Sequence, residues 1–368
     1  MMRKNDWEAF RGKKILITGH TGFKGAWLSE LLLLSGADVT GYSLEPPTEP
    51  NLFRLLGLEK RMRSVTGDIR DIGRLTGVMK EVQPEMVIHL AAQPLVRESY
   101  RDPVGTFSTN VMGTVNICEA VRQSDCVRSF LNVTTDKVYL NTERQEGYRE
   151  DEPLDGYDPY SNSKSCSELV THSYIRSFFS EQGKAVSTAR AGNVIGGGDF
   201  AADRILPDAV RAVLEQRPVG VRNPHSVRPY QHVLEPLGVY MEILLRQAED
   251  IRYAGYYNVG PDEEDTITTG ELATLFTEAF GEGAKWQAEN PDGPHEANFL
   301  RLSNQKIKDV FGWHPVWKVK RAVEETAAWT KAFRNTRFLS MEEGEAEIRK
   351  ETDREILAWI SEGEPAGQ

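Results

Sequence analysis

Three glycines at intervals of three follow a short, largely apolar segment near the start of the chain. Residues 13–18 (KKILIT) are that segment, and Gly19, Gly22 and Gly25 follow it in GHTGFKG. The apolar run predicts a buried strand, and residues 22–34 carry apolar side chains at helical spacing. Such a turn lets a pyrophosphate approach the free N–H groups of a helix N-terminus. A glycine triplet alone would fit a plain strand-to-helix turn equally well. Its position at the start of an alternating strand and helix pattern favours a dinucleotide-binding turn.

Strand-like and helix-like segments alternate along the first half of the chain. Strands are predicted at residues 13–18, 39–44, 65–68, 86–91, 129–134 and 185–191, and helices at residues 22–34, 72–82, 103–122 and 160–182. Such alternation predicts a parallel sheet with helices on both faces. The expected fold class is α/β, a Rossmann-type doubly wound sheet with a smaller mixed C-terminal substrate lobe.

The pattern becomes irregular after residue 192. Residues 193–203 are glycine-rich, helices are predicted at residues 204–215, 233–247 and 269–280, and a short strand is predicted at residues 256–259. We expect residues 1–192 to form the dinucleotide-binding domain with the catalytic residues. Residues 193–340 are expected to form a lobe for the substrate, partly interleaved with that domain. Residues 341–368 predict an acidic helical tail, expected as a solvated appendage.

Charge and cysteine content restrict the partners. The chain has 44 Lys and Arg residues and 55 Asp and Glu residues. The resulting net charge of −11 argues against a nucleic-acid-binding protein. More than half of the excess lies in residues 341–368. No apolar run approaches the roughly 18 residues of a membrane-spanning helix. The three cysteines form no CxxC motif, so no metal site is predicted and a reducing, cytoplasmic setting is expected.

The choice between NAD and NADP depends on residues after the second predicted strand. An acidic residue about 20 positions beyond the turn would bind the ribose 2′-OH. Glu45 has this spacing, but Ser43 ends the strand more naturally. No arginine occurs in residues 39–47 to bind a 2′-phosphate, which favours NAD. Asp68 is a second candidate for the adenosine end, and capping of the next helix is its alternative.

Tyr160 and Lys164 form a YxxxK pair at the start of a predicted helix. A spacing of four places both side chains on one helical face. The reference pKa of tyrosine is about 10, and a neighbouring ammonium and a positive nicotinamide ring would both favour the phenolate. The pair could remove a proton from a sugar hydroxyl while hydride leaves the same carbon. YxxxK is common by chance, but its position after the fifth strand makes it specific.

The segment TTDKVY follows the fifth predicted strand. Ligands of open α/β sheets bind beyond the carboxyl ends of the strands. Thr135, Asp136 and Lys137 are therefore expected to face the substrate. A turn with a capping aspartate and a solvated lysine is the alternative.

These motifs resemble those of the extended short-chain dehydrogenase/reductase family. The glycine turn, LAAQ at residues 90–93, Asn110 in NVMGT and YxxxK cover roughly the first 190 residues. More narrowly, the chain is similar to the CDP-D-glucose 4,6-dehydratases to about Phe333, in GHTGFKG, TTDKVY, GYDPYSNSK, RAGNVIGGGD, SVRPYQHVLEPL and PHEANFL. Related dTDP-sugar dehydratases typically carry glutamate in place of Lys137, which makes the match specific.

The resemblance implies a hydro-lyase acting on a nucleotide-activated hexose, with NAD as the cofactor. Tyr160 would take the proton of the C4 hydroxyl while hydride passes from C4 to NAD. Water would then leave across C5 and C6, with Asp136 as the acid and Lys137 assisting at C5. Hydride would return to C6, giving the 4-keto-6-deoxy sugar, and Thr135 would hydrogen-bond the C4 oxygen.

The resemblance and the motifs together give two sets of expected binding residues. Those expected to contact NAD are Gly19, Thr21, Gly22, Phe23, Lys24, Gly25, Ser43, Asp68, Ile69, Leu90, Ala91, Ala92, Gln93, Asn110, Thr134, Tyr160 and Lys164. Those expected to contact the nucleotide sugar are Asn193, Arg204, Arg228, Gln231 and His295. Arginine suits a diphosphate because it donates two parallel hydrogen bonds. Surface ion pairs and ordinary loop hydrogen bonds are the alternatives for the second set.

The sequence departs from the family pattern at residues 140–146 and in its acidic tail. The altered segment is expected near the sugar, so a different sugar stays open. An NAD-dependent epimerase or reductase on another nucleotide sugar is one alternative function, and it would not need Asp136 and Lys137 as an acid/base pair. A non-catalytic NAD-binding protein is another, although Tyr160 and Lys164 are both present. The resemblance also implies a homodimer through helices 103–122 and 160–182.

Overall fold

A computed structural model of the chain describes residues 4–289 and 299–364. Within these residues, the central element is a seven-stranded parallel sheet in the order β11-β6-β5-β4-β1-β2-β3. Its strands are β1 (Lys14–Thr18), β2 (Asp38–Ser43), β3 (Arg63–Thr66), β4 (Met86–His89), β5 (Ser129–Thr135), β6 (Ala185–Ala191) and β11 (Tyr256–Val259). This is the doubly wound order, so the α/β prediction is confirmed.

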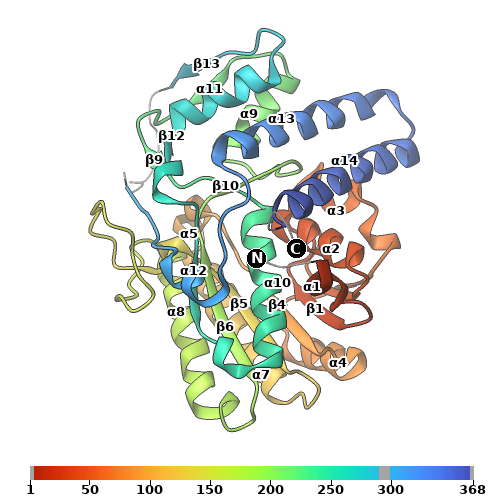
Figure 1. Cartoon of the computed structure of the whole chain (residues 1–368), viewed down its shortest axis with the longest axis vertical. Coiled ribbons are helices and arrows are strands. Elements are labelled where there is room, and N and C mark those ends of the chain that lie inside the picture. The colour runs from red at the N-terminus through yellow and green to blue at the C-terminus, as the bar shows by residue number, and fades with distance from the viewer. Residues whose placement is uncertain (1–3, 290–298, 365–368) are drawn as a thin grey trace.

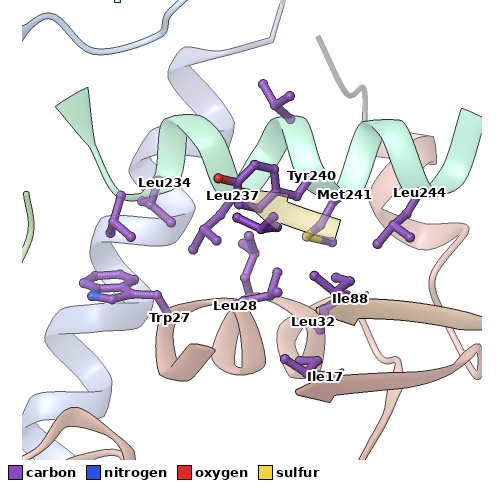
Figure 2. Close-up of a cluster of buried hydrophobic side chains, with 14 of the residues drawn as sticks. Ile17, Trp27, Leu28, Leu32, Ile88, Leu234, Leu237, Tyr240, Met241 and Leu244 are labelled. Carbon is purple, nitrogen blue, oxygen red and sulfur yellow. The ribbon is translucent and has the colours of Figure 1, made fainter. Parts of the chain in front are cut away.

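Helices cover both faces of the sheet (Figure 1). One face packs against α2 (Phe23–Leu34) and α10 (Leu234–Glu249), and the other against α4 (Ile72–Val82), α7 (Gly113–Arg122) and α8 (Pro159–Tyr174). Figure 2 shows the two helices of the first face meeting above Ile17 and Ile88 of the strands, through Leu28, Leu32, Leu234, Leu237 and Leu244. Full burial of each leucine contributes about 1.5–3 kcal/mol.

The two long helices predicted in the first half are each interrupted. Residues 103–122 divide into α6 (Pro103–Phe107), a π-helical segment (Ser108–Met112) and α7. Residues 160–182 divide into α8 and a second π-helical segment (Ile175–Phe179). Single π turns frequently occur at functional sites, and the first of these contains Asn110, one of the residues expected to contact NAD.

A second lobe packs above the carboxyl edge of the sheet. Its core is shared by α9 (Ile205–Leu214), α11 (Thr269–Phe280) and α13 (Val319–Asn335). Short strand pairs join β8 (Val219–Val221) to β13 (Trp286–Ala288), β9 (Val227–Arg228) to β12 (Ile267–Thr268), and β7 (Val194–Ile195) to β10 (Gln231–His232). The remaining α-helices are α1 (Lys4–Glu8), α3 (Leu52–Leu55), α5 (Val96–Arg101) and α12 (Gln305–Phe311). Two elements within residues 193–340 belong to the main sheet layer instead of this lobe: β11 pairs with β6, and α10 packs on the sheet.

The expectation of a solvated C-terminal appendage is wrong. Residues 341–362 do form a helix, α14 (Met341–Glu362), which begins with a capping box between Ser340 and Glu343. However, α14 packs against α13 and α3 (Figure 1), and Ile348, Ile356 and Trp359 are buried. The prediction relied on the acidic composition of this segment and did not consider that its apolar residues recur at helical spacing on one face.

Cys118, Cys126 and Cys166 are free thiols. In the parts of the chain that the structure describes, no helix combines the length and apolar character needed to cross a membrane.

Candidate active site

The glycine turn has the geometry that a pyrophosphate requires. Gly19 has φ +79°, and a Cβ there would lie 2.7 Å from the backbone nitrogen of Ala91. A Cβ on Gly25 would lie 2.2 Å from the carbonyl oxygen of Gly19, so both positions need glycine. Gly22 is different, because its nearest neighbour would be 3.5 Å away and no side chain caps α2 there. The open face and the uncapped N–H groups beside Phe23 fit the pyrophosphate of NAD.

The end of β2 is the expected position of the adenosine ribose. The hydroxyl of Thr21 lies 2.9 Å from Oγ of Ser43 and donates to the carbonyl of Leu44 at 2.9 Å. The structure thus brings two predicted residues together. Glu45 is instead engaged by Arg54 at 3.5 Å and by Thr66 at 3.1 Å on the exposed edge.

Asp68 does not cap the following helix, because the side chain of Asp71 caps α4. The carboxylate of Asp68 instead accepts hydrogen bonds from the Arg70 guanidinium, the shortest at 2.6 Å, and this interaction lowers the pKa of Asp68. The neighbouring Ile69 is buried, and its carbonyl accepts a hydrogen bond from Asn116 at 3.0 Å. Asp68 and Ile69 therefore lie in a fixed turn after β3.

The segment after β4, residues 90–93, is fastened to the helix that carries YxxxK. The N–H of Gln93 donates to Oδ1 of Asn110 at 2.8 Å, and Nδ2 of Asn110 donates to Oγ of Ser163 at 2.9 Å. Ser163 in turn donates to the carbonyl of Tyr160 at 2.7 Å. Sequence reasoning identified these residues except Ser163, which gave no signal because it occupies a variable position of YxxxK.

Four predicted catalytic side chains gather at the carboxyl end of β5. The hydroxyl of Thr135 donates to Oδ1 of Asp136 at 2.9 Å, and Nζ of Lys137 lies 3.5 Å from the same oxygen. Thr135 also hydrogen-bonds Tyr160, which begins α8. Asp136 is buried at 2 % exposure, and it is Thr135, not Asp136, that caps the following turn. A buried carboxylate beside a lysine and a tyrosine can transfer protons to and from a bound substrate.

Burial has opposite effects on the two residues of YxxxK. Lys164 donates to the carbonyl of Val133 at 2.9 Å, and burial lowers its pKa to about 8 although Glu168 opposes the shift. Burial raises the pKa of Tyr160, against the ammonium of Lys137 and the hydrogen bond with Thr135. The ammonium of Lys137 thus favours the phenolate of Tyr160.

We expect activity to fall as the pH rises through about 8. Lys164 keeps its ammonium below that pH and loses it above, and Lys24, whose pKa burial also lowers to about 8, does the same. Their deprotonation removes positive charge from the site of proton removal. The dependence of kcat/KM on pH measures this. In Lys164→Arg, whose guanidinium does not titrate there, the alkaline limb should become less steep, because Lys24 alone then loses its proton near pH 8. An alkaline limb of unchanged steepness in that variant would contradict the assignment to Lys164.

The residues expected to bind the nucleotide sugar approach this cluster from the second lobe. Gln231 is buried, its N–H donates to the carbonyl of Asn193 at 3.1 Å, and its Nε2 donates to the carbonyl of Val259 at 3.1 Å. Its Oε1 has no hydrogen-bond partner among the described residues. Arg204 pairs with Asp199 at 3.2 Å, an aspartate that sequence reasoning did not assign although it ends the GGGD motif.

Arg228 lies in β9, and the next residue, Pro229, approaches Gly192 beside the Asp136 carboxylate. His295 falls outside the described residues. A further connection comes from Lys24, whose ammonium interacts electrostatically with Arg204, Asp136, Lys164 and Lys137. Lys24 was expected only as part of the glycine turn, and its pKa is also affected by charged residues of the catalytic cluster.

Behind the catalytic cluster, Glu168 ties β5 and β6 to α8. It is fully buried and accepts hydrogen bonds from Thr134, from Thr188 at 2.7 Å and from Arg190 at 3.0 Å. Thr134 precedes the catalytic Thr135, so this network fixes the end of β5 against the YxxxK helix. Sequence reasoning expected Thr134 near NAD but missed Glu168, which lies one turn after Lys164 without any motif of its own.

Comparisons with known proteins identify the family of this chain. The family model described as GDP-mannose 4,6 dehydratase matches residues 16–326. A curated relative, the CDP-glucose 4,6-dehydratase of Salmonella typhimurium, is 45% identical over 339 residues, which cover 90% of this chain and 94% of the relative.

Solved structures show the same fold. The UDP-glucose 4-epimerase of Thermus thermophilus in complex with NAD is 26% identical with a TM-score of 0.75, and the match covers 86% of this chain and 98% of that one. The dTDP-glucose 4,6-dehydratase of Bacillus anthracis in complex with NAD is 22% identical with a TM-score of 0.73, covering 89% and 98%. The second likeness concerns the fold alone.

Proposed function

The chain belongs to the GDP-mannose 4,6-dehydratase family, and we propose that it catalyses the NAD-dependent 4,6-dehydration of CDP-D-glucose to CDP-4-keto-6-deoxy-D-glucose. One observation carries the proposal. Thr135, Asp136 and Lys137 adjoin Tyr160 at the carboxyl edge of the sheet. A chain with this cluster is 45% identical to a CDP-glucose 4,6-dehydratase. The protein is accordingly a hydro-lyase of the nucleotide-sugar type.

The acid and base beside Tyr160 favour a dehydratase over an epimerase or reductase. Removal and return of hydride at a sugar carbon need one proton acceptor, which Tyr160 supplies. Loss of water across C5 and C6 needs two further groups, one to receive the C5 proton and one to protonate the leaving hydroxyl. Asp136 and Lys137, 3.5 Å apart, provide such groups.

The roles of the residues follow from their positions. The glycine turn and the start of α2 would hold NAD, which would supply the acceptor and donor of hydride. Tyr160 takes the proton of the C4 hydroxyl while Thr135 hydrogen-bonds the C4 oxygen. Once C4 is a ketone the C5–H bond is acidic. One proton passes within the ion pair from the Lys137 ammonium to the Asp136 carboxylate, so the neutral amine of Lys137 can take the C5 proton. Asp136 then gives its proton to the C6 hydroxyl, which leaves as water.

The second lobe supplies the residues proposed for the nucleotide. Arg204 and Arg228 suit the diphosphate, and the unpartnered Oε1 of Gln231 is an acceptor for a ligand donor. Asn193 positions Gln231 through its carbonyl. His295 is proposed on its sequence position alone. A cytoplasmic, reducing location accords with the free cysteines.

The test is a direct assay of product mass. The purified protein is incubated with CDP-glucose and, in parallel, with dTDP-glucose, UDP-glucose and GDP-mannose, and each product is analysed by mass spectrometry. Loss of one water from CDP-glucose alone, without net reduction of NAD, is the expected result. An isomer of unchanged mass would support the epimerase, and no reaction with any sugar would support a non-catalytic role.

We further propose a homodimer through the two helical segments at residues 103–122 and 160–182, which contain α6, α7 and α8. Exposed apolar side chains lie on or beside these helices, including Val104 at 78 % exposure, Leu169 at 51 % and Met112 at 52 %. Exposed apolar side chains of this size often mark a protein interface.

Val104→Glu should therefore shift the protein from dimer toward monomer, since it would bury a charge at the interface. Sedimentation velocity measures the change. Leu357→Glu, at an exposed apolar position on α14, serves as the control and should leave the assembly state unchanged. A wild-type protein that sediments as a monomer would contradict the proposed dimer.

A further inference from the structure

Helix α14 lies beyond residues 16–326, which the family model accounts for, and yet its inner face belongs to the core. Nε1 of Trp359 donates to Oε1 of Glu235 on α10 at 2.8 Å. Its ring fits over Gly238 of the same helix, where a Cβ would lie 2.2 Å from the indole. Because α10 covers the main sheet, α14 is fastened to the layer that carries the catalytic strands.

A second contact joins α14 to the substrate lobe. Nε2 of His232 lies 2.6 Å from Oε1 of Glu355, and both side chains are fully buried. Nδ1 of His232 accepts the N–H of Leu234 at 3.3 Å, and Nε2 faces the carboxylate. The rings of Trp27 and Trp317 cross the imidazole edge-on at 5.9 and 5.1 Å. Aromatic rings thus enclose the imidazole, and Glu355 is the side chain whose polar contact fixes its position.

His232 transmits this contact to a proposed substrate residue. It forms β10 together with Gln231, and β10 pairs with β7, placing Gln231 opposite Val194. Position 196 is also packed against the imidazole, because a Cβ on Gly196 would lie 3.3 Å from Nε2 of His232. Glu355 therefore sets the position of β10 and of the backbone that leaves β7.

A third contact supports the loop that continues from β7. Nε1 of Trp329 donates to Oγ1 of Thr352 at 3.1 Å, and a Cβ on Gly197 would lie 2.0 Å from the Trp329 ring. The carbonyl of Gly197 also accepts from Nε1 of Trp27 at 2.9 Å. Two residues further on is Asp199, which pairs with Arg204. Thr352 and Glu355 lie three residues apart on one face of α14. Through Trp329 and His232 they support residues 196–199 and β10.

We propose that Thr352 and Glu355 are positioning residues, through which α14 holds β10 and residues 196–199 in the arrangement that binds the nucleotide sugar. The identity of that ligand rests on the proposed function. The catalytic cluster is attached to β5 and α8, whereas Thr352 and Glu355 interact with Trp329 and His232. Loss of either contact should therefore weaken substrate binding and raise KM, while kcat changes little.

The experiment compares four substitutions at α14 with the wild type. Glu355→Met keeps the length of the side chain but cannot pair with His232, and Thr352→Val removes the acceptor for Trp329. Both should raise KM for CDP-glucose about tenfold with kcat within about twofold, and Glu355→Gln, which retains an oxygen acceptor, should restore most of the loss. Glu347→Gln, at a half-exposed position of the same helix, is the matched control and should change nothing.

Hydrogen exchange supplies a readout that does not depend on the substrate. Amides of residues 194–200 and 228–234 should exchange faster in Glu355→Met, with residues 86–93 unchanged. The proposal would be overturned if kcat fell by as large a factor as KM rose. It would also be overturned if the melting temperature fell while KM and the rates of hydrogen exchange stayed unchanged. If the wild type does not dehydrate CDP-glucose, the proposed function fails, and the exchange result still decides the role of α14. If Glu355→Met does not fold, Thr352→Val decides it.

Discussion

Replacing Tyr160 with phenylalanine is expected to reduce kcat by roughly 10³-fold while NAD binding and the fold stay intact. The substitution removes only the hydroxyl that takes the proton from the substrate, and a positioned acid or base contributes about 10²–10⁴-fold. The ring itself remains at the start of α8, so the hydrogen bonds among Gln93, Asn110 and Ser163, which involve the carbonyl of residue 160 and not its side chain, should persist.

Steady-state turnover of CDP-glucose, followed by product mass, measures this loss. NAD binding by calorimetry and the melting temperature show whether the site is otherwise intact. Tyr157→Phe is the matched control, because Tyr157 precedes the same helix and is 85 % exposed. If Tyr160→Phe retained turnover within about tenfold of the wild type, Tyr160 would not be the base, and the assignment of YxxxK would have to be abandoned.

The parts of the site that could be predicted from the sequence are those fixed by short-range geometry. Gly19 is required by its positive φ and Gly25 by its contact with Gly19, and both constraints arise within one strand–turn–helix unit, so the prediction of that unit needed no knowledge of the rest of the fold. Thr135 to Lys137 follow a buried strand directly. The carboxyl ends of parallel strands share one edge, so these residues and Tyr160 could be placed together in advance.

The parts that could not be predicted depend on contacts between distant segments. His232 and Glu355 are separated by more than a hundred positions, and each alone is an unremarkable residue of a short strand or an acidic helix. Glu168 and Arg190 likewise meet only because α8 lies across β6. The net charge of α14 favoured a helix exposed to solvent on all sides. A net charge does not distinguish the charged outer face of a helix from its apolar inner face. A count of apolar residues by helical position, as in Ile348, Ile356 and Trp359, was the available signal.

The second large effect is expected at Asp136. Asp136→Asn should leave oxidation at C4 possible but stop the loss of water, because an amide cannot supply the proton that the C6 hydroxyl needs in order to leave. The amide has nearly the shape of the carboxylate, so the contact with Thr135 can be kept and the fold should not change. The rate of formation of the dehydrated product should fall by about 10²–10³-fold.

This variant separates the dehydratase from its nearest alternative function. With CDP-glucose it should show the near-ultraviolet absorbance of reduced nicotinamide, because the sugar is oxidised and cannot proceed to the step that reoxidises the cofactor. Asp199→Asn is the control: it weakens the pairing with Arg204 and should raise KM without any such absorbance. Undiminished water loss in Asp136→Asn would show that another group protonates the C6 hydroxyl. In that event the pairing of Asp136 with Lys137 would be electrostatic only, and the argument for dehydration over epimerisation would rest on product analysis alone.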